Sequence, residues 1–227
     1  SANAIDVEPG RGVYTQWLND RGGIEADLTV TRLSQDEFWV ITSAASQTRD
    51  WAWLRRASRQ RDVDISDITE QWSVLGVMGP SSRHLLESIS DADLSNEHCP
   101  FGSMREIEVG GTRCRALRMS YVGELGWELY VPADSAEKLY LSIVEAGRSF
   151  GLRHAGFHAM NSLRLESGYR HWGHDISDED TPLEAGLGFA VAWDKPGGFI
   201  GREALLKQKD APRTKRLIQF RIEDTDL

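Results

Sequence analysis

The first part of the fold is decided by the stretch Gly22-Gly23-Ile24-Glu25-Ala26-Asp27-Leu28-Thr29-Val30-Thr31. Its glycines follow Asn19-Asp20-Arg21, and such residues tolerate the positive φ of a tight turn, so residues 13–18 and 28–33 are predicted to form a β-hairpin. Side chains alternate between the two faces of a strand, which puts Asp27, Thr29 and Thr31 on the face opposite Leu28 and Val30. This carboxylate lies either on a solvent-facing edge or in a site.

A second carboxylate stands in the stretch Tyr121-Val122-Gly123-Glu124-Leu125-Gly126-Trp127-Glu128. A strand at 127–131 directs its apolar side chains to one face and Glu128 and Tyr130 to the other. The glycines allow a close turn, so Tyr121 and Glu128 are expected to approach the same space from adjacent strands. A carboxylate flanked by aromatic rings suits a flat ligand with adjacent N–H donors. A solvent-exposed Glu on a simple hairpin is the alternative.

The remaining elements indicate an α+β fold with mixed or antiparallel sheets, because strands meet in hairpins rather than in regular βαβ units. Further strands are expected at 38–42, 73–78, 105–109, 113–121, 127–131 and 217–222. Helices are expected at 47–60, from about 82 to Ile89, over about sixteen residues after a cap at Asp134 or Ser135, at 157–169 and at 202–209.

Composition excludes several classes of function. The 227 residues carry a net charge of −9, which argues against nucleic acid as a partner. The arginines at 49, 55, 56, 59 and 61 sit among Asp50, Asp62 and Asp64, as on a solvated helix face. No apolar run is long enough to cross a bilayer, and no secretory signal opens the chain. Cys99 and Cys114 form no disulfide framework, which favours a reducing compartment, either the cytoplasm or the mitochondrial matrix.

Metal, dinucleotide and serine-nucleophile sites are not expected. The histidine pairs His154/His158 and His171/His174 have neither an HExxH pattern nor a cysteine partner. The turn at 76–80 lacks GxGxxG, and no serine lies in a GxSxG motif.

Four motifs in this order and spacing resemble the folate-binding domain shared by the glycine-cleavage T-protein and the C-terminal halves of dimethylglycine and sarcosine dehydrogenases. They are the two stretches above, Ser162-Leu163-Arg164-Leu165-Glu166-Ser167-Gly168 and Asp180-Thr181-Pro182-Leu183-Glu184-Ala185-Gly186-Leu187. The residues 169–176 and 199–205 are more similar to the dehydrogenase branch.

The resemblance implies an aminomethyltransferase-type transferase in which several subdomains surround a central channel for tetrahydrofolate. It assigns catalysis to Asp27 and cofactor binding to Glu128, Tyr121 and Thr29. We expect this domain, N-terminally incomplete, at 1–222, and the start of a missing C-terminal barrel at 223–227.

In the dehydrogenase branch such a domain captures the methylene or formaldehyde equivalent of an N-methylglycine-type amine as 5,10-methylenetetrahydrofolate. The expected partners are folate, a small amine donor and an upstream flavin domain, and FAD is expected only if that separate domain exists. No nucleic acid or membrane partner is expected.

Three other functions stay open within this fold. They are a stand-alone glycine-cleavage aminomethyltransferase, a non-catalytic folate-binding regulator of iron–sulfur assembly, and a sulfonium-dependent demethylase. The presence of Asp27 favours an enzyme over the regulator, whose relatives lose that aspartate. Where T-proteins have an Arg-Asp pair, this chain has Met160-Asn161, so an arginine contact to the folate tail is not carried over.

Overall fold

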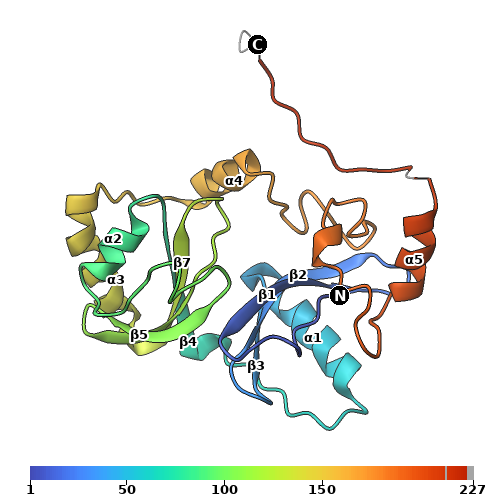
Figure 1. Ribbon diagram of the computed structural model, residues 1–227, viewed down its shortest axis with the longest axis horizontal. Helices are drawn as coiled ribbons and strands as arrows, with labels where there is room; N and C mark the ends of the chain where they lie inside the picture. The colour runs from blue at the N-terminus through green and yellow to red at the C-terminus, as the bar shows by residue number, and fades with distance from the viewer. Residues whose placement is uncertain (213, 224–227) are drawn as a thin grey trace. The chain divides into compact units, whose positions relative to one another are not determined.

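The computed structural model describes residues 1–212 and 214–223 (Figure 1). The strands are β1 (Arg11–Leu18), β2 (Ile24–Arg32), β3 (Phe38–Ile41), β4 (Trp72–Met78), β5 (Met104–Val109), β6 (Thr112–Leu117) and β7 (Gly126–Pro132). The α-helices are α1 (Gln47–Ser58), α2 (Ser82–Glu87), α3 (Ala136–Gly147), α4 (Phe157–Glu166) and α5 (Arg202–Asp210).

The strands form two sheets, one with the order β1-β2-β3 and one with the order β4-β7-β6-β5. In the second sheet β7 pairs antiparallel with both β4 and β6, and β5 pairs antiparallel with β6. The expected α+β class with antiparallel sheets is therefore confirmed.

The chain divides into two compact units. Unit 1 contains Ser1–Asn3, Tyr14–Thr29 and the described residues from Arg170 onward, and unit 2 contains Ala4–Val13 and Val30–Tyr169. Asp27 and Thr29 belong to unit 1, whereas Tyr121 and Glu128 belong to unit 2.

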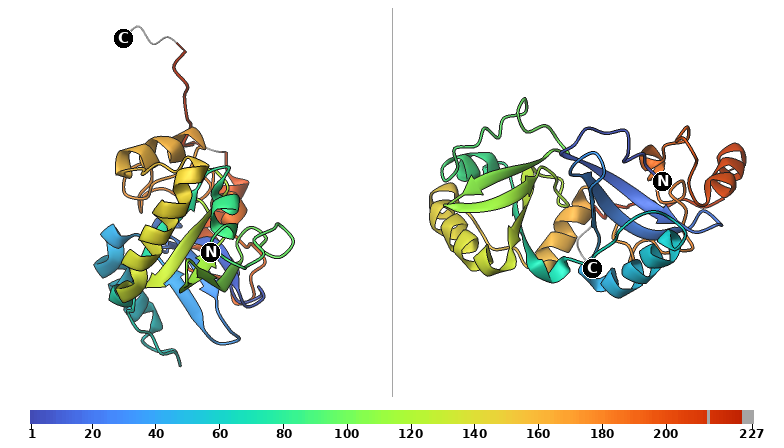
Figure 2. Two further views of the ribbon diagram at one scale, coloured as in Figure 1. Left: turned by 90° about the vertical axis from the view of Figure 1, so that its left-hand side faces the viewer. Right: turned by 90° about the horizontal axis from the view of Figure 1, so that it is seen from below.

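In unit 2 the four-stranded sheet has two different faces. Helices α2 and α3 cover one face (Figures 1 and 2), and the fully buried Trp127, Leu129 and Val131 of β7 pack into the core beneath them. The other face carries Tyr130, which packs with Leu117 in a separate cluster. The expected alternation along β7 is confirmed, and it leaves Glu128 on the face away from the helices.

In unit 1 the core gathers the start of the hairpin and the segment after residue 170. Leu18 of β1 and Ile24 of β2 pack with Leu205 of α5, and all three are buried. Between them, Asn19 Oδ1 accepts from the backbone N–H groups of Arg21 and Gly23. This side-chain turn is the predicted hairpin connection.

Two expectations about helix α3 differ from the structure. The helix has 12 residues, and Arg148–Phe150 continues it as a 3₁₀ turn. Ser135 occupies the N-cap position, but its hydroxyl donates to Asp134 Oδ1 instead of accepting from the helix backbone. A 3₁₀ turn at Ala133–Ser135 precedes the helix and takes the place of the capping bond.

The expected strand at 217–222 is wrong. Ile218, Phe220 and Ile222 alternate with polar residues as a strand would, yet they are exposed and the segment forms no strand. Alternation needs a neighbouring strand to form a ladder, whereas Leu217 N donates to Glu184 O, which belongs to no strand. Of the region expected at 223–227, residues 224–227 lie outside the described residues.

Candidate functional site

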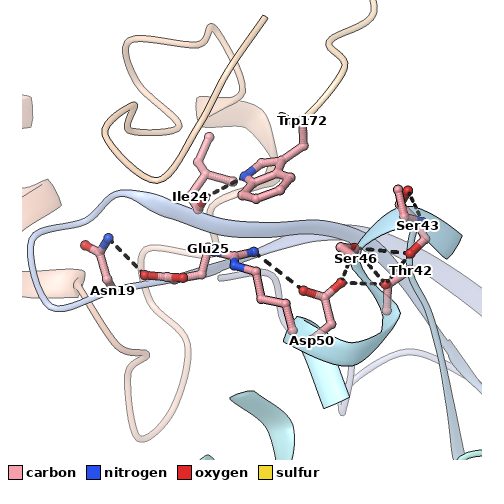
Figure 3. A network of polar contacts seen from close by, with 10 residues as sticks. Asn19, Ile24, Glu25, Thr42, Ser43, Ser46, Asp50 and Trp172 are labelled. Carbon is pink, nitrogen blue, oxygen red and sulfur yellow. Dashed lines mark hydrogen bonds and ion pairs between the residues drawn. The ribbon is translucent and has the colours of Figure 1, made fainter. Parts of the chain in front are cut away.

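Strand β2 is held in place at its first residue. Trp172 Nε1 donates to the carbonyl oxygen of Ile24 at 2.7 Å (Figure 3), and Ile24 N donates to Asp180 O at 2.9 Å. A Cβ on Gly23 would lie 1.9 Å from Asp178 O, so only glycine permits this approach. Both ends of the polar stretch 172–180 therefore fix the strand that carries Asp27.

Asp27 lies in the middle of β2, where it is half-buried. Ile24, Ala26 and Leu28 are buried, whereas Asp27 and Thr29 are half-buried, as the alternation predicted. Thr31, which follows on the same strand, does not face solvent. It is 0% exposed, and its Oγ1 has no hydrogen-bond partner in the described residues. The face that carries Asp27 is thus partly enclosed.

The Asp27 carboxyl is bonded to side chains of β1. Gln16 Nε2 donates to Asp27 Oδ1 at 3.0 Å, and Tyr14 forms a second side-chain hydrogen bond. Desolvation raises the pKa of Asp27, and the bonds from Tyr14 and Gln16 offset part of that rise. A carboxyl with a raised pKa and a fixed orientation accepts a proton at higher pH than an exposed aspartate does.

Glu128 is central in β7, opposite Gly76 of β4 and Leu117 of β6. Since directly opposed residues share a face, Gly76 itself places no side chain beside the carboxylate. The nearest atom to an added Cβ at Gly76 would be Met78 Cε, at 3.3 Å. Tyr130 Oη donates to Glu128 Oε2 at 2.5 Å. Burial raises the pKa of Glu128, and the Tyr130 bond lowers it in part.

Tyr121 lies in a loop and not at the end of a strand, so the predicted strand at 113–121 is too long. Strand β6 ends at Leu117. Ser120 Oγ accepts from Val122 N at 3.2 Å, and such a local bond replaces the strand ladder. The Tyr121 ring stacks on Tyr169 with centroids 6.3 Å apart, which holds it within unit 2.

A tight contact supports this loop. Gly123 has φ +75°, and an added Cβ would lie 1.9 Å from Ser167 Oγ, which itself donates to Val122 O. The glycine in the quoted motif therefore permits the loop to lie against the residue after α4.

The site residues form local groups within each unit. In unit 1, β2 carries both Asp27 and Thr29, and β1 contributes Gln16 to Asp27. In unit 2, Glu128 is bonded to Tyr130, and Tyr121 is stacked on Tyr169.

Sequence reasoning missed Gln16, Tyr14 and Tyr169. Gln16 and Tyr14 lie in the predicted strand at 13–18, but the sequence does not indicate which polar side chains of that strand contact Asp27. The alternation predicts the correct face for Tyr130, but the expected neighbour of Glu128 is Tyr121, whereas the structure bonds Tyr130 to Glu128. Tyr130 lies two residues after Glu128 on the same strand, and this spacing is the signal in the sequence that identifies Tyr130 as its neighbour.

At Met160-Asn161 the chain differs from the Arg-Asp pair of T-proteins, and the structure shows what Asn161 contacts. Asn161 Oδ1 accepts from Arg164 Nε at 2.8 Å, and Arg164 Nη1 donates to Tyr169 O at 3.0 Å. Arg164 is buried. Asn161 thus helps to satisfy an internal arginine at the end of α4.

Two further features bear on the class of site. Within residues 1–212 and 214–223, no group of three or more His, Cys, Asp or Glu side chains is arranged to hold a metal ion. In the same residues, no helix combines the length and the apolar character that a membrane crossing requires.

Two curated relatives are similar to nearly the whole chain. The chain is 46% identical over 222 residues to the 4-methylaminobutanoate oxidase (formaldehyde-forming) of Paenarthrobacter nicotinovorans, covering 98% of this chain and 27% of the relative. It is 39% identical over 235 residues to the mitochondrial sarcosine dehydrogenase of Homo sapiens, covering 97% of this chain and 26% of the relative. The chain spans about a quarter of the length of these relatives.

A solved structure has the same fold. The glycine cleavage system aminomethyltransferase T from Bartonella henselae matches with a TM-score of 0.76 and 28% identity, over 90% of this chain and 54% of that chain. The model of the GCVT N-terminal domain matches residues 1–195. These matches confirm the resemblance of the four motifs: the chain belongs to the GCVT N-terminal domain family of folate-dependent, aminomethyltransferase-type domains.

Proposed function

We propose that this chain is the tetrahydrofolate-dependent transfer domain of a larger protein similar to dimethylglycine and sarcosine dehydrogenases. It captures the methylene or formaldehyde equivalent of an N-methylglycine-type amine, and the product is 5,10-methylenetetrahydrofolate. The observation that carries the proposal is the desolvated Asp27 carboxyl, bonded to Gln16 Nε2 at 3.0 Å. The motif resemblance is what assigns the catalytic role to this residue.

The acceptor groups of the chain fit tetrahydrofolate chemically. In the described residues Tyr130 is the side chain that donates to Glu128, at Oε2, so Oε1 is left to accept N–H donors of a pterin edge. Tyr121 and Thr29 complete the proposed binding residues. Bound tetrahydrofolate would supply the nitrogens that take up the one-carbon unit.

Asp27 is proposed to do the proton chemistry. Gln16 occupies Oδ1, and the carboxylate accepts a proton and stabilises positive charge that develops beside it. Its raised pKa brings proton uptake closer to neutral pH than for an exposed aspartate.

The donor side of the reaction belongs to the rest of the larger protein. One relative is named a formaldehyde-forming oxidase and another a sarcosine dehydrogenase, and this chain covers 27% and 26% of them. Amine oxidation is therefore proposed for an upstream flavin domain with FAD, with this chain as the folate-dependent acceptor.

A stand-alone aminomethyltransferase is the second candidate. The likeness to the Bartonella henselae aminomethyltransferase T at a TM-score of 0.76 favours it. The donor would then be an aminomethyl group on a lipoyl carrier.

The test compares Asp27→Asn with the unchanged full-length protein that carries this chain. With sarcosine or dimethylglycine and tetrahydrofolate, we expect 5,10-methylenetetrahydrofolate formation to fall by about 10²–10⁴-fold in the variant. Amine consumption should continue, with the carbon released as free formaldehyde. Folate affinity by calorimetry should change little. Asp67→Asn, at an exposed aspartate of unit 2, is the matched control.

The outcomes separate the candidates. Unchanged product formation in Asp27→Asn removes the catalytic role of this residue. Turnover with an aminomethyl-lipoyl carrier but not with N-methyl amines supports the stand-alone aminomethyltransferase. Failure of the unchanged protein to bind tetrahydrofolate overturns both candidates.

A further inference from the structure

Gln16 is a buried amide whose two polar atoms have very different surroundings. The residue is 0% exposed in β1. Its Nε2 donates to Asp27 Oδ1 at 3.0 Å, whereas its Oε1 is buried and accepts no hydrogen bond from the described residues.

This arrangement lowers the stability of the folded chain. A buried carbonyl without a donor loses its hydration and gains nothing in return, and an apolar side chain of the same size would avoid that loss. A buried polar group left partly unsatisfied calls for an explanation outside packing. Here the remaining contact of the amide is with Asp27.

The other two buried polar atoms without a partner differ from this case. They are the hydroxyls of Thr31 and Thr112, and each belongs to a small, half-apolar side chain whose shape valine would reproduce. Within the described residues, neither hydroxyl is hydrogen-bonded to a residue of the proposed site. Thr112 in β6 therefore provides a matched control for the removal of an unsatisfied buried group.

We propose that Gln16 is a positioning residue for Asp27, whose amide N–H fixes the carboxylate for proton acceptance while its unsatisfied oxygen is tolerated for that purpose. The inference rests on the proposed function for the chemical role of Asp27. The contact itself, its length and its burial belong to unit 1 and do not depend on that role.

Other ionisable groups surround this pair and must be held constant in any test. Tyr14 on β1 is bonded to Asp27, and Glu25 lies two residues before Asp27 on β2. The Ser1 amino group donates to Gln16 O at 2.6 Å, and burial, together with the charge of Lys195, lowers the pKa of that amino group to about 5. None of these groups is altered by replacing the Gln16 side chain.

The test replaces Gln16 with methionine, which has a similar shape but neither donor nor acceptor. Because the Gln16 bond lowers the pKa of Asp27, its loss should raise that pKa further, and the carboxyl ¹³C signal should titrate at higher pH. In the full-length protein kcat for methylenetetrahydrofolate formation should fall by about tenfold or more, with its acid limb moved to higher pH. KM for tetrahydrofolate should stay unchanged, and the thermal midpoint should not fall.

Two further variants keep the result interpretable. Thr112→Val should leave the Asp27 titration and kcat unchanged. Gln16→Glu preserves side-chain size and adds a second carboxyl beside Asp27, so the Asp27 titration should move to still higher pH. This second variant decides the question if Gln16→Met fails to fold.

An unchanged Asp27 titration in Gln16→Met, or in Gln16→Glu if the first variant is unfolded, overturns the proposal. A large loss of thermal stability with an unchanged titration also overturns it, because that pattern indicates a purely structural role. A raised Asp27 pKa supports the Gln16 assignment even where the unchanged protein shows no folate turnover, and that second result overturns the proposed function alone.

Discussion

Strands β2 and β7 each carry one desolvated carboxyl among apolar neighbours, but the two carboxyls are held in different ways. Asp27 on β2 is bonded by the side chains of another strand, Gln16 and Tyr14. Glu128 on β7 is bonded by Tyr130 of its own strand, and the residue opposite it on β4 is Gly76.

The difference fits the two tasks proposed for these residues. Donors from a second strand fix Asp27 in orientation, as a group that exchanges a proton requires. Glu128 has one oxygen occupied and a glycine beside it, which suits a group that receives an additional donor pair from a flat ligand. The shared feature, a pKa raised by burial, does not by itself distinguish them.

The largest expected difference between the two carboxyls is in their effect on the affinity for tetrahydrofolate. Glu128→Gln should weaken tetrahydrofolate binding by roughly 10–100-fold, because a hydrogen bond to a charged group contributes about 1.5–3 kcal/mol. Turnover at saturating folate should change much less than in Asp27→Asn. Calorimetry and initial rates on the full-length protein measure the two quantities separately.

Glu108→Gln, on the exposed side of β5, is the control for this substitution. An unaltered dissociation constant in Glu128→Gln would remove Glu128 from the pterin site. Equal losses of affinity in both glutamate variants would show a general charge effect.

A smaller effect is expected from Tyr130→Phe. The ring and its edge contact with Trp39 remain, but Glu128 loses the bond that lowers its pKa, so that pKa should rise. If folate binds the ionised carboxylate, the pH at which affinity declines should move upward, with a loss of roughly 2–10-fold at a fixed mildly acidic pH. Binding isotherms between pH 5 and 8 are the measurement.

Tyr140→Phe is the matched control, because this tyrosine is exposed on α3 and bonded to His154. If Tyr130→Phe binds folate with the same pH dependence as the unchanged protein, Tyr130 does not control the ionisation of Glu128.

The sequence allowed the local parts of both strands to be predicted. Asn19 and the glycines identified the hairpin, and alternation placed Asp27 and Glu128 on the faces opposite their apolar neighbours. These features depend on short-range backbone preferences and on a period of two, which a single sequence displays directly.

The contacts that give the carboxyls their character could not be predicted in the same way. The Gln16–Asp27 bond joins residues 11 positions apart, and its existence depends on how two strands register. The segment at 217–222 fails for a related reason, since its alternation is correct but a strand also requires a partner. The roles of Asp27 and Glu128 came from the family resemblance and remain proposals.

The smallest expected effect concerns stability. Because burial raises the pKa of Asp27 and of Glu128, each carboxyl favours the folded state most at low pH, and that contribution is lost as the pH rises through the folded pKa. The melting temperatures of Asp27→Asn and Glu128→Gln, relative to the unchanged chain, should therefore be higher at pH 7 than at pH 3.

Asp67 provides a control of opposite sign, because bonds from Thr69 and Gln47 lower its pKa. Asp67→Asn should be less stable than the unchanged chain at pH 7, and this difference in stability should disappear as the pH falls. Calorimetric scans resolve such changes, since 1 kcal/mol corresponds to about 2–4 °C in a chain of this size. The same pH trend in all three variants would contradict desolvation as the property that β2 and β7 share.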